Sequence, residues 1–270
     1  MTLRLRFGFS PCPNDTHAFF GIAHGVVPVN IDGEVFEIEP ILADIEELNE
    51  RALGADPLEI SKLSTGVLHE AVDRYQPLEA GAALGRGVGP LVVRRDDEIH
   101  EGGLGQLVGE RVAIPGFHTT AFSLLRRFGP EIEPVVMRFD RILSAVESGD
   151  VRAGLIIHES RFTYRDHGLV AVADLGRLWE AAFGLPLPLA VIGLSRSLPA
   201  GLRWPVTQAL TESVRIAQDQ PRRARSFVRQ NAQEMEDAVC AQHIGLYVNE
   251  FSLRLGLEGR EALKVFLSSV

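Results

Sequence analysis

The sequence predicts an α/β protein built from two α/β lobes that are joined by two crossing strands. Short apolar runs alternate with helix-periodic segments along most of the chain, which favours a mainly parallel sheet in each lobe. Extended segments near residues 88–95 and 186–194 interrupt this alternation and indicate the two crossings. They divide the chain into lobe 1, residues 1–92 plus 195–270, and lobe 2, residues 93–194, with a ligand cleft between the lobes.

The first lobe begins with strands and helices in alternation. Asp44 is a helix N-cap, and Glu47 follows it at the spacing of a capping pair. The glycines of residues 85–89 indicate a backbone that must approach another segment closely, before the chain leaves the lobe in a strand. The expected strands are 3–9, 35–42, 58–61 and 91–93. The expected helices are 16–24, one that begins at Asp44, and 64–74.

The second lobe repeats the alternation, and the chain after Pro199 is helix-periodic throughout. The expected elements of the second lobe are strands at 111–114, 135–139 and 153–157, and helices ending at Phe128 and spanning 140–148. The expected C-terminal helices are 206–218, 222–233, 237–253 and 259–267. Their apolar residues suit either a cover for the core or the face of a homodimer, with Tyr247, Phe251 and Phe266 as candidates.

Composition excludes several classes of protein. The 270 residues carry a net charge of −9, whereas a nucleic-acid-binding surface would need a basic stripe. No apolar run approaches the length of a membrane span, and no secretory signal opens the chain, so a cytoplasmic protein is expected. The two cysteines, Cys12 and Cys240, have neither disulfide nor zinc-site spacing, and Cys12 is expected to be a small packed residue.

The segment from Gly154 to Ser160 carries the clearest chemical signal. An apolar strand delivers His158 at its carboxyl end, which is where open α/β sheets bind ligands. An imidazole in that place suits proton transfer near neutral pH. Asp140 precedes His158 by 18 residues, and Asp44 precedes Lys62 by the same interval, so the two lobes present Lys62 and His158 at matching positions.

Three strand-to-helix junctions place small polar side chains at the first turn of a helix. They contribute Ser10 and Asn14, then Ser64, then Thr119 and Thr120. Free N–H groups at helix starts favour a carboxylate ligand, although a hydroxyl that only caps its own helix produces the same pattern. Three such junctions facing one cleft favour a small-molecule carboxylate.

The remaining candidates are weaker. Lys62 suits an anion contact and the neutralisation of neighbouring dipoles equally well. Arg161 suits a salt bridge or an anion contact, although a position at the solvated surface is favoured. The histidines show no HxH or HExxH spacing, so no metal site is expected. Glycines 85–89 match neither nucleotide-binding pattern.

Several of these strings closely resemble one family, the 1,4-dihydroxy-6-naphthoate synthases of the futalosine route to menaquinone. The resemblance runs from Leu3 to about Ser252, and it is weaker in the spacer 30–36 and at the C-terminal end. The strings that carry it are Phe9-Ser10-Pro11-Cys12-Pro13-Asn14-Asp15-Thr16, Lys62-Leu63-Ser64, residues 81–90, 115–120 and Ile156-Ile157-His158-Glu159-Ser160-Arg161-Phe162-Thr163-Tyr164.

The resemblance implies a periplasmic-binding-protein-like fold of type II and a carbon–carbon lyase that needs no redox cofactor or metal. The implied substrate is cyclic dehypoxanthinyl futalosine, and the implied products are 1,4-dihydroxy-6-naphthoate and a dehypoxanthinyl sugar fragment. His158 matches the proton-abstracting base of the family. The implied substrate contacts are Lys62, Leu63, Ser64, Thr119 and Thr120.

Two other functions fit the same fold. One is a cytoplasmic small-anion binding protein, although the chain has no segment that would serve as an output domain. The other is the chorismate dehydratase of the same pathway, and the Leu155-Ile156-Ile157-His158-Glu159-Ser160 string favours the naphthoate synthase over it.

Overall fold

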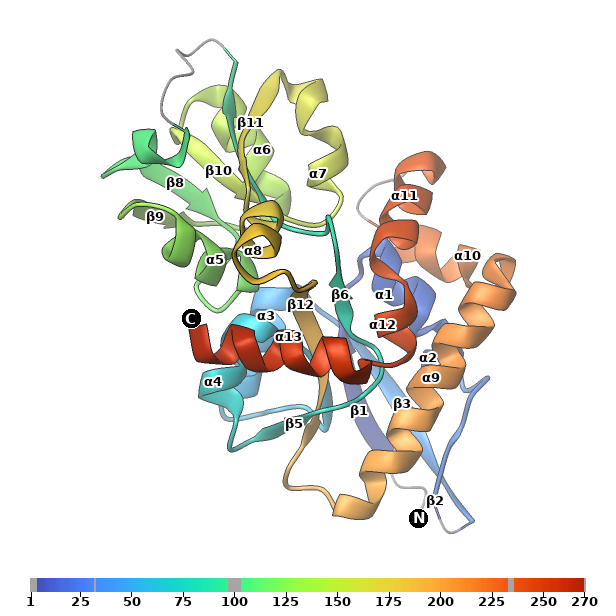
Figure 1. The fold of residues 1–270 in the computed structure, drawn as a ribbon. Helices are drawn as coiled ribbons and strands as arrows, with labels where there is room; N and C mark the ends of the chain where they lie inside the picture. The colour runs from blue at the N-terminus through green and yellow to red at the C-terminus, as the bar shows by residue number, and fades with distance from the viewer. Residues whose placement is uncertain (1–3, 32, 97–102, 233–235, 270) are drawn as a thin grey trace.

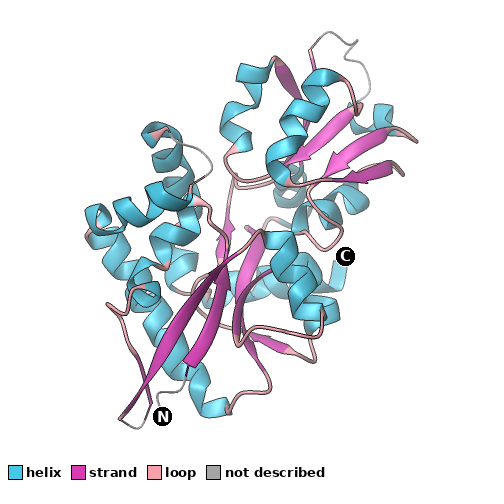
Figure 2. Cartoon of the chain, turned by 180° about the vertical axis from the view of Figure 1, so that it is seen from behind, coloured by secondary structure: helices cyan, strands magenta, loops and turns pink. Residues whose placement is uncertain are grey.

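Two α/β lobes lie one above the other in the computed structural model, which describes residues 4–31, 33–96, 103–232 and 236–269 (Figure 1). Each lobe contains its own β-sheet, and the view from behind shows the sheets separated by connecting loops (Figure 2). No helix among the described residues is both long and apolar enough to cross a membrane.

The sheet of the first lobe has a parallel centre and antiparallel additions. Strand β1 is parallel to β3 and β4, whereas β12 runs antiparallel to β4, β5 and β6, and β2 antiparallel to β3. In spatial order the strands are β2 (Val29–Ile31), β3 (Glu34–Leu42), β1 (Arg4–Phe9), β4 (Ile60–Ser64), β12 (Leu187–Ser195) and β5 (Tyr75–Pro77), with β6 (Ala83–Gly85) also paired to β12.

The sheet of the second lobe follows the same plan. Strands β10, β8 and β9 are parallel, and β7 runs antiparallel to β10 and β11. In spatial order the strands are β11 (Leu169–Asp174), β7 (Leu91–Arg95), β10 (Ala153–Ile156), β8 (Arg111–Ile114) and β9 (Glu133–Val136). The helices of this lobe are α5 (Thr120–Phe128), α6 (Phe139–Ser148), α7 (Ser160–Thr163) and α8 (Leu175–Phe183), with 3-10 turns at Gly103–Leu107 and Tyr164–His167.

Helices from both ends of the chain cover the first sheet. Early in the chain these are α1 (Pro13–Ala18), α2 (Phe20–Ala23), α3 (Ile45–Leu53), the 3-10 turn Thr65–Val67 and α4 (Leu68–Ala71). The C-terminal helices are α9 (Arg203–Asp219), α10 (Pro221–Asn231), α11 (Asp237–Tyr247), α12 (Glu250–Leu253) and α13 (Gly256–Ser269), preceded by a 3-10 turn at Ala200–Leu202. Figure 1 shows α13 lying across the junction between the lobes.

The chain passes between the lobes twice, between β6 and β7 and again between α8 and β12. Strand β12 pairs within the first sheet along its length, from Leu187 to Ser195. The strand-pairing pattern therefore assigns Leu91 to the second sheet and Leu187 to the first. The extent of each lobe stays a prediction, with lobe 1 at residues 1–92 plus 195–270 and lobe 2 at residues 93–194.

Several expected helices are shorter than their apolar periodicity indicated. The helix expected at 16–24 is interrupted at Phe19. The helix expected at 237–253 ends at Tyr247, and Asn249 then forms a capping box with Ser252 at the start of α12. The Asp44 side chain accepts a hydrogen bond from the Glu46 N–H, not from Glu47. The helix expected at 140–148 begins one residue earlier, at Phe139. Gln233, the expected end of a helix, lies outside the described residues.

The C-terminal helices cover the core. Phe266 is 1% exposed and packs on Trp179, with ring centroids 5.4 Å apart. Tyr247 is buried in the same apolar cluster, which otherwise consists mainly of second-lobe residues. For Tyr247 and Phe266 the structure thus shows the cover, and a homodimer face stays a prediction.

Candidate active site

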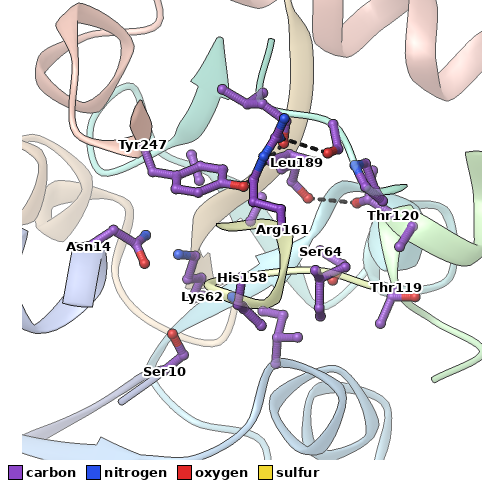
Figure 3. A pocket seen from close by; sticks show the side chains of 18 of the residues that line it. Ser10, Asn14, Lys62, Ser64, Thr119, Thr120, His158, Arg161, Leu189 and Tyr247 are labelled. Carbon is purple, nitrogen blue, oxygen red and sulfur yellow. Dashed lines mark hydrogen bonds between the residues drawn. The ribbon is translucent and has the colours of Figure 1, made fainter. Parts of the chain in front are cut away.

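A cavity opens between the lobes at the carboxyl ends of β1, β4 and β10 and at the start of α5 (Figure 3). Its empty volume is about 650 Å³, open solvent included. Small-molecule sites are concave and combine an apolar lining with a few convergent polar groups, as this cavity does. This is also the edge at which α/β sheets bind ligands.

Seven of the eight predicted site residues line this cavity. They are Ser10, Asn14, Lys62, Ser64, Thr119, Thr120 and His158. Leu63 does not, because alternation along β4 turns its side chain away from the face that carries Lys62 and Ser64. Its side chain is 0% exposed and packs in an apolar cluster with Val67 and Val191. The prediction of a substrate contact through the Leu63 side chain has no support in this geometry.

His158 is held in an unusual backbone conformation. Its φ is 55°, and it is the single non-glycine residue with a positive φ within the described part of the chain. Strained backbone of this kind is concentrated at functional sites, where the surrounding structure keeps it in place. Strand β10 ends at Ile156, so the strain coincides with the turn that presents the imidazole at the cavity.

The imidazole of His158 is neutral near physiological pH. Burial, assisted by the positive charge of Lys62, lowers the pKa of His158 to about 4, and Asp15 opposes this shift. The ring packs edge-on against Phe139, with centroids 4.8 Å apart. Its buried Nε2 has no hydrogen-bond partner among the described residues. A neutral imidazole with a free nitrogen can accept a proton.

Lys62 forms a buried ion pair with Asp15. The Asp15 carboxylate also accepts hydrogen bonds from the Ser10 hydroxyl at 2.7 Å and the Asn14 amide at 2.8 Å. The pairing neutralises most of the Lys62 charge, yet Lys62 still lines the cavity. Lys62 lies within β4 and not beyond its end, because β12 pairs with β4 as far as Ser64.

The hydroxyl groups at the helix starts make hydrogen bonds within the protein. Thr119 caps α5 by accepting from the Phe122 N–H at 3.2 Å, and Ser64 accepts from Asn49 at 3.0 Å. Thr120 donates to the Leu189 carbonyl at 2.6 Å and thereby joins α5 to β12 (Figure 3). The Thr119 hydroxyl therefore acts as a helix cap. The first backbone N–H groups of α5 remain as hydrogen-bond donors at the cavity.

Glu46 connects the two lobes beside the cavity. Its carboxylate accepts from the backbone N–H of His118 and lies 2.9 Å from His118 Nδ1. Glu46 belongs to α3 of the first lobe, whereas His118 precedes α5 of the second. A side chain at Gly116 would overlap with Glu46, so glycine is needed for this close approach.

Three polar residues of the cavity were not expected there from the sequence: Arg161, His243 and Tyr247. Arg161 was expected at the surface, but its side chain is 13% exposed and donates to the Gly89 carbonyl at 2.8 Å. His243 and Tyr247 come from α11, and no local motif marks them. The one available signal was their spacing of four residues, which puts both on one helix face.

Cys12 lies beside the cavity without lining it. The thiol is free and buried, and burial raises its pKa well above the usual value. A thiol so protonated is a poor nucleophile. The expectation of a small packed residue is confirmed.

Comparisons with known proteins identify close relatives. A family model described as menaquinone biosynthesis matches residues 5–270. A protein of Thermus thermophilus named 1,4-dihydroxy-6-naphtoate synthase is 48% identical over 96% of this chain and 91% of its own length. A protein of the same name from Streptomyces coelicolor is 42% identical over 98% of this chain and 92% of its own.

Solved structures support the fold. A crystal structure of a protein from Archaeoglobus fulgidus is 33% identical with a TM-score of 0.88, covering 98% of this chain and 96% of that one. The periplasmic aliphatic sulphonate binding protein of Escherichia coli has a TM-score of 0.64 at 13% identity, over 99% and 88% of the two chains. At that identity the likeness concerns the fold alone, and it confirms the predicted periplasmic-binding-protein-like architecture.

Proposed function

Because the chain belongs to the menaquinone biosynthesis family, we propose that it is a carbon–carbon lyase acting on cyclic dehypoxanthinyl futalosine. The products are 1,4-dihydroxy-6-naphthoate and a dehypoxanthinyl sugar fragment. The observation that carries the proposal is His158, a neutral imidazole with an unpartnered nitrogen, held at the cavity by a strained turn. The names of the two relatives support the product.

The reaction begins with His158 removing an activated proton next to a carbonyl of the substrate. Loss of this proton allows the carbon–carbon bond to the sugar to break, and the bicycle becomes aromatic. Aromatisation supplies the driving force. General base catalysis of this kind contributes about 10²–10⁴-fold in rate. Burial and the Lys62 ammonium oppose protonation of His158 before substrate binds, and the Asp15 carboxylate partly offsets them.

The substrate carboxylate needs a cationic or N–H-rich partner. The N-terminus of α5 supplies backbone donors, and the helix dipole favours negative charge there. Arg161 is the second source, since its guanidinium lines the cavity, one nitrogen holds the Gly89 carbonyl, and its ion pair with Asp174 is long, at 3.9 Å. Lys62 is less suited because Asp15 already neutralises it. We assign the carboxylate to the side of the cavity formed by α5 and Arg161.

Turnover of cyclic dehypoxanthinyl futalosine by wild type and His158→Asn tests the proposal, with the naphthoate product followed by mass spectrometry. The wild type is expected to release 1,4-dihydroxy-6-naphthoate, and the variant is expected to bind the substrate but lose nearly all turnover. Asn keeps a polar side chain of similar size without a basic nitrogen.

Other outcomes of the same experiment favour the alternatives. Equal turnover by His158→Asn would remove His158 as the base. Dehydration of chorismate by the wild type would identify the chorismate dehydratase of the pathway. Binding without turnover would identify a small-anion binding protein of the same fold.

A further inference from the structure

His243 is a buried polar side chain at the cavity for which the proposed mechanism has no role. It comes from α11, is 1% exposed, and lines the same cavity as His158. Neither Nδ1 nor Nε2 has a hydrogen-bond partner among the described residues. Burial of an unpaired polar group is unfavourable, so such a group in a native protein calls for an explanation.

Aromatic packing, rather than hydrogen bonding, holds the His243 ring in place. The ring centroid lies 4.7 Å from that of Tyr247 and 6.3 Å from that of Phe162. Tyr247 is itself fixed, since its hydroxyl donates to the Val88 carbonyl at 3.3 Å. The imidazole is thus oriented without a hydrogen bond from either nitrogen to a described residue.

His243 is also a neighbour of the proposed base. The rings of His158 and His243 lie 6.4 Å apart between centroids, at an interplanar angle of 38°. Both imidazoles line one cavity, so neighbouring groups of a single ligand can contact the two rings.

We propose that His243 is a specificity-determining residue that hydrogen-bonds a hydroxyl group of the ligand, close to the atom on which His158 acts. The inference deepens the proposed function and rests on it for the identity of the ligand. A hydroxyl fits because it accepts from the N–H of a neutral imidazole or donates to its bare nitrogen, whichever of the two faces the ligand. A carboxylate only accepts, so it would need the nitrogen that carries the proton on that side.

The electrostatic surroundings agree with a neutral His243. Burial lowers its pKa well below the usual value, and the nearby His158, Lys62 and Arg161 act in the same direction. The ring therefore presents one donor and one acceptor at physiological pH. A site built to hydrogen-bond a hydroxyl rejects analogues that lack it, because its own polar groups are then left unpaired.

Four proteins test the inference: wild type, His243→Phe, His243→Gln and Cys240→Ala. Phe keeps the aromatic packing and removes both nitrogens, whereas Gln restores a donor and an acceptor. Cys240 is a matched control, since it is buried on the same helix and does not line the cavity. The measurements are kcat and KM for cyclic dehypoxanthinyl futalosine, the dissociation constant of 1,4-dihydroxy-6-naphthoate, and the temperature of unfolding.

We expect His243→Phe to lower kcat/KM about 10-fold or more, mainly through KM, as loss of a ligand hydrogen bond of about 1.4 kcal/mol would do. His243→Gln should recover part of this loss, and Cys240→Ala should stay within about twofold of wild type. A purely structural role would lower the unfolding temperature and would not be rescued by Gln.

The inference is overturned if folded His243→Phe keeps wild-type kcat/KM, or if His243→Gln is no better than His243→Phe. If the Phe variant does not fold, His243→Leu takes its place in the comparison with Gln. A wild type that binds the naphthoate but does not turn over the futalosine compound defeats the lyase proposal alone, and the binding constants then decide the role of His243. A wild type that binds neither compound defeats both.

Discussion

His158 combines two properties that rarely occur together in an ordinary surface histidine. Its backbone lies in the left-handed region, and its imidazole has an unpartnered buried nitrogen. The first property is strained for a residue with a side chain, and the second is unfavourable for any polar atom. Both are explained if the turn exists to present the ring to a substrate.

The lowered pKa of His158 predicts an unusual pH profile. A base works only when unprotonated, so kcat/KM should stay level as the pH falls from 8 through the usual titration range near ~6.5. Activity should fall only as the pH approaches about 4, where His158 becomes protonated. Initial rates with buffers of constant ionic strength measure this, over the range in which circular dichroism shows the protein folded. An acidic limb centred near ~6.5 would contradict the shift.

Thr119 serves the fold and the cavity together. Since its hydroxyl caps α5, Thr119→Val should reduce the free energy of unfolding by about 0.5–2 kcal/mol. The change should also weaken substrate binding more than it alters kcat, because the helix start that faces the carboxylate becomes less ordered. Urea unfolding and steady-state kinetics separate the two effects. Thr211→Val, in α9 and away from the cavity, is the control, and an equal kinetic effect there would refute the assignment.

At the scale of elements, the glycine-rich connection between β6 and β7 brings two backbones together. A side chain at Gly89 would overlap with the backbone of Gly176 at the start of α8. The Gly89 carbonyl also accepts the hydrogen bond from Arg161. The close approach expected from the glycines of residues 85–89 is thus confirmed at Gly89, where it determines the position of a cavity side chain.

Gly89→Ala should therefore lower both stability and activity. The added methyl group must displace α8 or the connection, which costs about 1–3 kcal/mol in a well-packed region. The shift also moves the acceptor of Arg161, so we expect KM to rise. Gly245→Ala is the matched control, because a side chain at this position in α11 meets no other atom within 4 Å. Thermal unfolding should show a loss in the first variant and a small gain in the second.

At the scale of the whole molecule, contacts between the lobes surround the cavity. Glu46 binds the His118 backbone, and Thr120 donates to the Leu189 carbonyl. Phe266 of α13 packs against Trp179 of the second lobe. These contacts hold the lobes together around the cavity.

Removing the Glu46 contact should loosen this closed arrangement. Glu46→Ala is expected to increase the radius of gyration measured by small-angle X-ray scattering and to raise KM. Glu47→Ala provides the control, because Glu47 is exposed on the same helix. Scattering curves that cannot be distinguished between the two variants would show that other contacts hold the lobes.

The family resemblance drawn from short strings is confirmed by the family match over residues 5–270. Short strings are enough to recognise the family because strand ends and turns need particular residues within a few positions of each other. Ile157-His158 is an example. Strand positions such as 111–114 were recovered for the same reason, since alternation of apolar residues is a local property.

Other features depended on contacts between distant segments. The Lys62–Asp15 pair joins residues 47 positions apart. Pairing with β12 extends strand β4 as far as Ser64, whereas the local sequence pattern predicted an earlier end for this strand. His243 and Tyr247 reach the cavity because α11 packs against α1 of the first lobe while Tyr247 joins the apolar cluster of the second. Periodicity along the chain specifies which face of an element is buried, but which other element covers that face is decided by packing in three dimensions. That is why the imidazole at the strand end was recognisable in the sequence, whereas the second imidazole beside it was not.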